Sequence, residues 1–197
     1  MFDLFFTPWG MIAVASLLVL LLAIPGSLYL RRAANARRIQ SMLEKHTSGM
    51  IKDAVIPDGI DGYVFADYLL RIGNSIVTLN IESRKGYVFG APNIDEWTCV
   101  ENKRSEKFNN PLKRATLFAQ QAKHLSGFHH VDALVLFDNN SEFPKGVPQG
   151  VLRLARFEEE IDVLNGRDNE HKAAEQAWAT LIAITDEART QLDAHDN

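Results

Sequence analysis

The first strong pattern along the chain is an uninterrupted apolar run, from Gly10 to Leu30, that contains no charged residue. Its 21 residues match the length of a helix that crosses the hydrocarbon core of a bilayer. A helix of a soluble core is a poorer explanation, because such a helix usually keeps one polar face. The run therefore predicts one transmembrane helix near the N-terminus.

After this run, strand-like and helix-like patterns follow one another. Two apolar-rich stretches, 64–72 and 75–83, are separated by Gly73-Asn74, a dipeptide suited to a tight turn, and predict a β-hairpin. The stretch Val131–Phe137 is nearly all apolar, as expected of a strand covered on both faces. Further strands are expected at 52–57, 87–89, 97–100 and 151–154, and helices at 37–46, 111–125, 158–164 and 170–192. This order of elements predicts an α/β fold.

The composition is that of a folded protein, with 23% charged and 46% apolar residues. The net charge of −4 argues against a chain that binds nucleic acid through bulk charge alone. The single cysteine, Cys99, excludes an internal disulfide and a thiolate zinc site within one chain. No phosphate-binding loop, dinucleotide fingerprint or nucleophile elbow occurs, so we expect no small-molecule cofactor.

The charges around the apolar run give it an orientation. Only Asp3 precedes the run, whereas four arginines follow it, Arg31, Arg32, Arg37 and Arg38. The positive-inside rule then places the N-terminus outside and the main domain in the cytoplasm. A cleaved signal peptide is the alternative, but it requires a basic segment before the apolar run. We expect a single-pass protein of the cell inner membrane, with an anchor at 1–32, a domain at 33–155 and an acidic helical segment at 156–197.

Charged residues at the ends of the predicted hairpin are the main candidates for chemistry. Asp67 lies near the start of its first strand and Glu82 near the end of its second, so antiparallel pairing brings two carboxylates to one edge of the sheet. Two carboxylates beside a cation can hold a hard divalent ion against a phosphate. Because side chains alternate along a strand, Glu82 and Arg84 share a face and Lys85 points away. The simpler alternative is a strand-edge acid paired with a nearby arginine.

A longer series of motifs surrounds these residues, over about residues 35–137. It consists of Val55-Ile56-Pro57-Asp58-Gly59, Ala66-Asp67, Ile81-Glu82-Ser83-Arg84, Gly86-Tyr87-Val88-Phe89-Gly90, Trp97 and Phe108-Asn109-Asn110-Pro111-Leu112. The ordered set resembles the NERD domain, the nuclease-related domain of the PD-(D/E)XK nuclease superfamily. The chain departs from that family's pattern at several points: Arg84 stands where the family usually has lysine, Tyr68 where it usually has histidine, and Phe65 where it often has glutamine. The spacing from Glu82 to Gly86 is also shortened.

The resemblance implies a restriction-endonuclease-like mixed sheet flanked by helices, here preceded by one transmembrane helix. It implies a metal-dependent nuclease that acts on DNA phosphodiesters, in which Asp67 and Glu82 hold Mg²⁺ or Mn²⁺ and Arg84 or Lys85 supplies the nearby positive charge. Acids on a helix can approach the metal in this superfamily, which makes Glu44 a candidate third ligand. The alternative for Glu44 is a solvated charge.

Because arginine replaces the usual lysine, a second function stays open: a catalytically degenerate nuclease fold that serves as a binding or interaction module at the membrane. An anchored structural protein of the envelope is a third interpretation, favoured if Asp67 and Glu82 lie far apart.

The remaining polar patterns are less specific. A basic run either neutralises DNA phosphates or forms a solvated face; it consists of Lys103, Arg104, Lys107, Lys113, Arg114 and Lys123. Adjacent residues on a strand face opposite ways, so His129 and His130 are not expected to share an ion. A stripe on the last helix is suited to packing on the core or on a second copy in a homo-oligomer; it comprises Ala174, Trp178, Leu181, Ile182 and Thr185.

Overall fold

The computed structural model describes residues 34–165 and 171–195, and the chain divides into two compact units, residues 1–45 and 46–197. Residues 34–46 are helical, in agreement with the helix expected there. The apolar run at 10–30, and with it the predicted transmembrane helix, lies outside the described residues. Within the described ranges, no helix combines the length and apolar character needed to span a bilayer.

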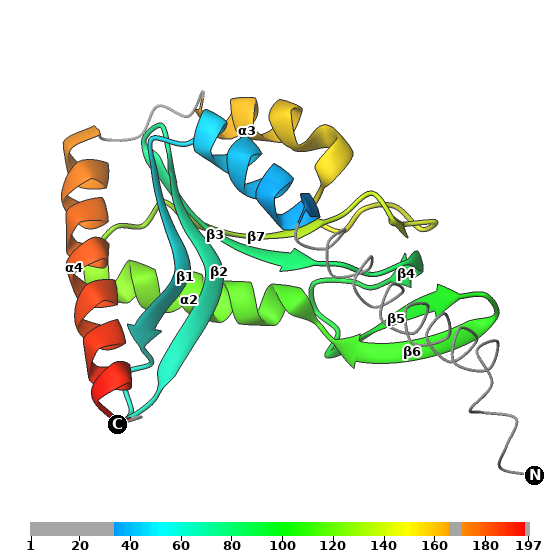
Figure 1. Ribbon diagram of the computed structural model, residues 1–197, viewed down its shortest axis with the longest axis horizontal. Helices are drawn as coiled ribbons and strands as arrows, with labels where there is room; N and C mark the ends of the chain where they lie inside the picture. The colour runs from blue at the N-terminus through cyan, green and yellow to red at the C-terminus, as the bar shows by residue number, and fades with distance from the viewer. Residues whose placement is uncertain (1–33, 166–170, 196–197) are drawn as a thin grey trace, which may run out of the picture. The chain divides into compact units, whose positions relative to one another are not determined.

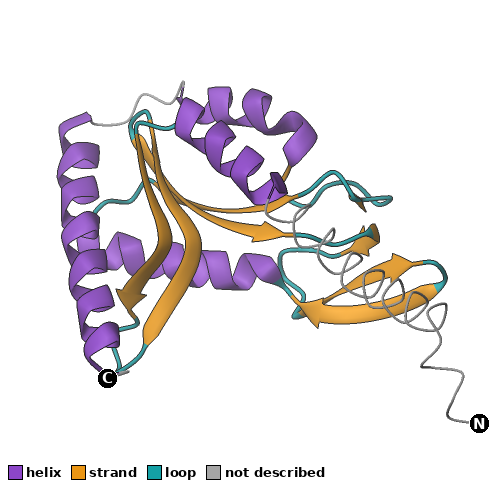
Figure 2. Cartoon of the chain, viewed as in Figure 1, coloured by secondary structure: helices purple, strands orange, loops and turns teal. Residues whose placement is uncertain are grey.

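The second unit is built on a five-stranded sheet with the order β1-β2-β3-β7-β9 (Figure 1). Its strands are β1 (Gly49–Pro57), β2 (Tyr63–Ile72), β3 (Ser75–Glu82), β7 (Val131–Phe137) and β9 (Val151–Arg153). The first three strands pair antiparallel, whereas β7 pairs parallel with both β3 and β9. The prediction of an α/β fold with a mixed sheet flanked by helices is therefore confirmed (Figure 2).

The predicted hairpin is present as β2 and β3. Ile72 pairs with Ser75 across a two-residue turn in which Gly73 has a φ of 56°. A positive φ of this size is one that glycine adopts at little cost, and the Gly-Asn turn thereby fixes the register of the two strands.

A second, four-stranded sheet follows in the order β6-β5-β4-β8. Its strands are β4 (Gly86–Phe89), β5 (Glu96–Glu101), β6 (Arg104–Asn109) and β8 (Ser141–Glu142). The sequence patterns predicted β4 and β5 but neither β6 nor β8. Because the side chains of β6 are exposed except that of Phe108, the strand lacks the apolar alternation that identifies a half-buried strand.

Helix α2 (Pro111–Ser126) begins and ends as its sequence predicts. Asn110 caps it by accepting a hydrogen bond from the Leu112 amide at 2.9 Å, Pro111 takes the first helical position, and Gly127 ends it in the left-handed region. Helices α2 and α3 (Phe157–Asn165) lie on opposite sides of β3 and β7 (Figure 1). Helix α4 (His171–His195) packs against β1 and α2.

Among the described residues, two apolar clusters show how the sheets are joined to the helices. The larger one joins the five-stranded sheet to α2 and α4, and includes Leu69, Ile76, Phe118, Ala174 and Leu181. The smaller one joins the second sheet to β7 and the start of α2, where the Trp97 and Phe137 rings stack with centroids 6.1 Å apart. The stripe on the last helix thus packs on the core, except that Ile182, which we placed on it, is 37% exposed.

Candidate functional site

The candidate site begins where β2 and β3 separate. Tyr68 and Leu79 form the last ladder pair toward this end of the hairpin. Beyond them, side chains take over the hydrogen bonding: the Asp67 amide donates to Oδ1 of Asn80 at 3.0 Å, and the Ile81 amide donates to Oδ2 of Asp67 at 2.6 Å. These reciprocal bonds satisfy two backbone groups that have left the ladder and fix the orientation of the Asp67 carboxylate.

Asn80 and Glu82 lie two residues apart on β3 and therefore share one face of the sheet. Ile76 lies on the same face and packs with Phe118 of α2, so this is the face that α2 covers. Asn80 is fully buried, and its Nδ2 has no hydrogen-bond partner among the described residues. An unpaired buried donor beside Asp67 leaves the polar network open to a water or to an anionic oxygen of a ligand.

Glu82 is the less exposed of the two candidate carboxylates, with 22% of its side chain accessible. Burial raises the pKa of the Glu82 carboxyl above its usual value, the positive charges of Arg84 and Arg114 oppose the rise, and the negative charge of Asp67 adds to it. Asp67 is hydrogen-bonded to Asn80 and to the Ile81 amide, and Glu82 is the next residue of β3. The two carboxylates therefore lie at the same end of the hairpin.

Arg84 follows Glu82 and is held on three sides. Its Nε lies 3.6 Å from Oε2 of Glu82, its Nη1 donates to Oε1 of Glu106 at 2.8 Å, and its Cζ lies 4.4 Å from the centre of the Phe108 ring. Glu106 and Phe108 both belong to β6, the strand that the sequence patterns did not predict. A planar guanidinium suits this combined stacking and pairing, which a lysine ammonium would satisfy less well.

Arg114 reaches the site from α2, with Nη2 3.8 Å from Oδ1 of Asp67. In the sequence it appeared only as one member of a basic run. Its role at the site depends on how α2 crosses the sheet, and spacing along the chain does not reveal that. The sequence feature that could have pointed to Arg114 is its position in the first turn of a helix that directly follows the motif residues.

The other predicted site residues have separate contacts. Lys85 pairs with Glu101 at 2.9 Å, and its side chain is largely exposed. Glu44 lies in the first unit, where it is exposed and accepts a hydrogen bond from Gln40 at 2.9 Å. Its part as a third metal ligand stays a prediction.

The two carboxylates fit a magnesium-type ion. Oδ1 of Asp67 has a loose contact with Arg114 at 3.8 Å, and Glu82 meets Arg84 through its other oxygen, Oε2, at 3.6 Å. Mg²⁺ is usually held by one or two carboxylates, with water and substrate phosphates completing its shell. Among the described residues, no three His, Cys, Asp or Glu side chains gather as a metal cage.

A hollow of about 650 Å³ lies beside Arg84 and is lined by charged groups of the second sheet. Its lining includes Lys85, Glu101, Arg104, Glu106 and Cys99. Burial raises the pKa of the Cys99 thiol, which keeps the sulfur protonated and unsuited to nucleophilic attack. The chemistry of this region is therefore that of charged side chains and not of a thiolate.

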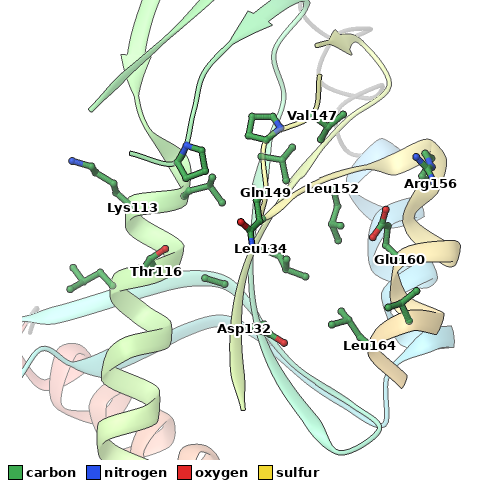
Figure 3. Close-up of a pocket in the computed structure, with 18 of the residues that line it drawn as sticks. Lys113, Thr116, Asp132, Leu134, Val147, Gln149, Leu152, Arg156, Glu160 and Leu164 are labelled. Atoms are coloured by element: carbon green, nitrogen blue, oxygen red, sulfur yellow. The ribbon is translucent and has the colours of Figure 1, made fainter. Parts of the chain in front are cut away.

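A larger hollow, of about 1020 Å³, lies elsewhere, between α2, β7 and α3 (Figure 3). Lys113, Thr116, Asp132, Arg156 and Glu160 contribute its polar lining, and apolar side chains such as Leu134 and Val147 surround them. Neither Asp67 nor Glu82 lines it. Size therefore does not identify the candidate site, which is defined by its paired carboxylates.

Asp67 and Glu82 thus lie at the separating ends of two strands, within a mixed sheet flanked by helices. The family model of the nuclease-related domain (NERD) matches residues 31–138, more than half of the chain. The chain belongs to the NERD family. Neither the comparison with curated proteins nor that with solved structures found a match.

Proposed function

We propose that the chain is a membrane-anchored, metal-dependent nuclease that acts on DNA phosphodiesters. The observation that carries this proposal is the placement of Asp67 and Glu82 at the same end of the hairpin, beside the guanidinium groups of Arg84 and Arg114. Membership of the nuclease-related family supports the same chemistry. A simple surface ion pair would not account for the buried, unpaired Nδ2 of Asn80 at the point where β2 and β3 separate.

Each residue has a defined part in this proposal. Asp67, oriented by the Ile81 amide, and Glu82, at the end of β3, would hold Mg²⁺ or Mn²⁺. A divalent ion bound there supplies an activated water and neutralises charge on the phosphate. Arg84 keeps a fixed positive charge next to Glu82, where related nucleases use lysine, and cannot exchange a proton at neutral pH.

Metal binding tests the proposal directly. Titration of the full-length chain with Mn²⁺ should show a site that is lost in Glu82→Ala and in Asp67→Ala. Glu101→Ala is the matched control. Glu101 pairs with Lys85, so this substitution removes the same charge without touching either candidate ligand. Equal binding by the wild type and Glu82→Ala would rule out this site.

The binding-module alternative is favoured by one observation, the tight confinement of Arg84 by Glu106 and Phe108. A guanidinium held in this way is poorly placed to assist a water molecule during attack. In a plasmid-nicking assay with excess Mg²⁺, DNA binding without cleavage by the wild type would support this second function. Cleavage that disappears in Asp67→Ala would support the first.

The cellular location belongs to the proposal as well. The arginines after Leu30, and the absence of cations before Gly10, support an N-out topology with the nuclease-related domain in the cytoplasm. A reporter that is active only in the cytoplasm, fused after Asn197, should be active. Activity of a reporter that works only outside the inner membrane would reverse the topology.

A further inference from the structure

Arg114 contacts the candidate site without being locked to it. Its Nη2 lies 3.8 Å from Oδ1 of Asp67, which is an electrostatic contact longer than a hydrogen bond. The Arg114 side chain is 53% exposed, so solvent surrounds about half of it. The guanidinium can therefore turn away from Asp67 without breaking a hydrogen bond to it.

The other site arginine lacks this freedom. Arg84 is 27% exposed, donates to Glu106 at 2.8 Å and stacks on Phe108. Movement of Arg84 toward a ligand would sacrifice both contacts. Of the two guanidiniums beside the carboxylates, Arg114 is the one that can change its partner.

The neighbouring cation on α2 is already engaged. Lys113 forms an ion pair with Asp95, in the loop before β5. The first turn of α2 contains no acidic residue, and its amide groups add partial positive charge at the same end of the helix. An anion that approaches Asp67 and Glu82 therefore meets Arg114 as the available cation of this turn.

We propose that Arg114 binds the nucleic-acid phosphate and does so by exchanging partners: it neutralises Asp67 while the carboxylates hold no divalent ion, and it contacts a phosphate oxygen once they do. This inference rests on the proposed function, because it takes Asp67 and Glu82 as the holders of the ion. It adds a residue of α2 to the site and assigns it to the substrate.

The exchange follows from the balance of charge. Without a divalent ion, the two carboxylates are the anions nearest to Arg114 and attract it. With the ion bound, their charges are balanced, and a phosphodiester becomes the stronger partner. A guanidinium binds phosphate through two parallel hydrogen bonds, which the present 3.8 Å contact with Asp67 does not provide.

The exchange predicts opposite effects of one substitution on two ligands. Arg114→Gln in the full-length chain removes a cation that competes for Asp67, so Mn²⁺ affinity without nucleic acid should rise about threefold. The same change removes the phosphate contact, so affinity for a cleavage-resistant phosphorothioate oligonucleotide at saturating Mg²⁺ should fall about tenfold. Calorimetry measures the first affinity and fluorescence anisotropy the second.

Lys113→Gln is the matched control, because it makes the same charge change one residue away on a side chain paired with Asp95. It should change each affinity less than about twofold. Arg114→Lys should restore the wild-type Mn²⁺ affinity and only part of the oligonucleotide affinity, since lysine keeps the charge but not the forked donors. Melting temperatures of all three variants verify that they are folded.

Three results would overturn the exchange: weaker Mn²⁺ binding in Arg114→Gln, equal effects of Arg114→Gln and Lys113→Gln, or a change in only one of the two affinities. If the wild type binds Mn²⁺ and any of these three results is obtained, the inference fails and the proposed function stands. If the wild type binds no Mn²⁺, the proposed function fails and the inference fails with it.

Discussion

Arg84 donates a hydrogen bond to Glu106 across the two sheets, with 2.8 Å between Nη1 and Oε1. The bond ties Arg84, two residues after the candidate carboxylate Glu82, to β6 of the second sheet. Cζ of Arg84 lies over the Phe108 ring, two residues further along the same strand, 4.4 Å from the ring centre. The second sheet therefore fixes the position of the Arg84 guanidinium.

Arg84→Lys should free the positive charge at this position from its contacts with Glu106 and Phe108. Lysine cannot both stack on Phe108 and pair with Glu106 as arginine does, and its flexible stem lets the ammonium approach Glu82. We expect divalent-dependent nicking of supercoiled plasmid to rise about tenfold over the wild type, a barrier change of roughly 1.4 kcal/mol.

Two variants control this prediction. Adding Asp67→Ala should abolish the gain, because a lysine without the metal ligand has little to act on. Lys85→Ala should leave nicking unchanged, since Lys85 pairs with Glu101. A wild type that cleaves well and is impaired by Arg84→Lys would show that arginine is a working catalytic residue.

Glu82 should make folding stability depend on pH. Burial, with the Asp67 charge adding to it, raises the pKa of this carboxyl in the folded chain. Its contribution to stability is complete below the unfolded pKa of about 4.3 and is lost as pH rises through the folded pKa.

Glu82→Gln removes the ionisation and keeps the shape of the side chain. The variant should therefore melt at a higher temperature than the wild type at neutral pH, and the difference should shrink in acid, where Glu82 is protonated in both states. Thermal unfolding followed by circular dichroism at several pH values measures both. A difference that is constant with pH would contradict the raised pKa.

The backbone just after the motif leaves no room for a side chain at Gly86. Its φ is 117°, and a Cβ there would lie 2.3 Å from the Val100 carbonyl oxygen of β5. Gly86→Ala should cost about 3 kcal/mol of unfolding free energy, from backbone strain and overpacking together. Gly127→Ala is the control: its φ of 67° is also positive, but open space surrounds the position, so only about 1 kcal/mol is expected. Equal losses in denaturant titrations would show that the close approach to Val100 has no cost.

Local sequence signals predicted the hairpin and half of the site. Gly73-Asn74 and its apolar flanks fix the register of β2 and β3, and this register places Asp67 and Glu82 at the same end of the hairpin. Asn80 also had a readable signal, since a polar residue two positions before Glu82 in an apolar strand shares its face.

The other half of the site depends on packing between distant elements. Only Phe108 of β6 is buried, so the strand that holds Arg84 resembles a polar loop in the sequence. Arg114 approaches Asp67 because α2 crosses the sheet, and helical periodicity gives the buried face of a helix but not the strand it meets. The sequence therefore did not reveal the contacts of Arg84 with β6 or the contact of Arg114 with Asp67.

Asn110 connects the site helix to the loop before β5. Its Oδ1 accepts from the Leu112 amide at 2.9 Å and so caps α2. Its Nδ2 donates to three carbonyl oxygens, those of Ala91, Pro92 and Ile94, at 3.3, 3.0 and 2.8 Å. One buried side chain thereby fixes the start of α2, four residues before Arg114, relative to this loop.

Asn110→Asp separates these two tasks. Aspartate still caps the helix, so a pure capping role predicts almost no loss of stability. The structure predicts instead a loss of about 3 kcal/mol, because a carboxylate would face three carbonyl oxygens in place of the donor they share. Asn109→Asp makes the same charge change at the exposed neighbouring position and should cost less than about 0.5 kcal/mol. Urea unfolding of both variants measures the difference, and equal losses would mean that the added charge, and not the loop contacts of Asn110, is responsible.

Since the start of α2 carries Arg114, Asn110→Asp should also weaken binding of the phosphorothioate oligonucleotide, while Asn109→Asp should change it no more than any single added negative charge.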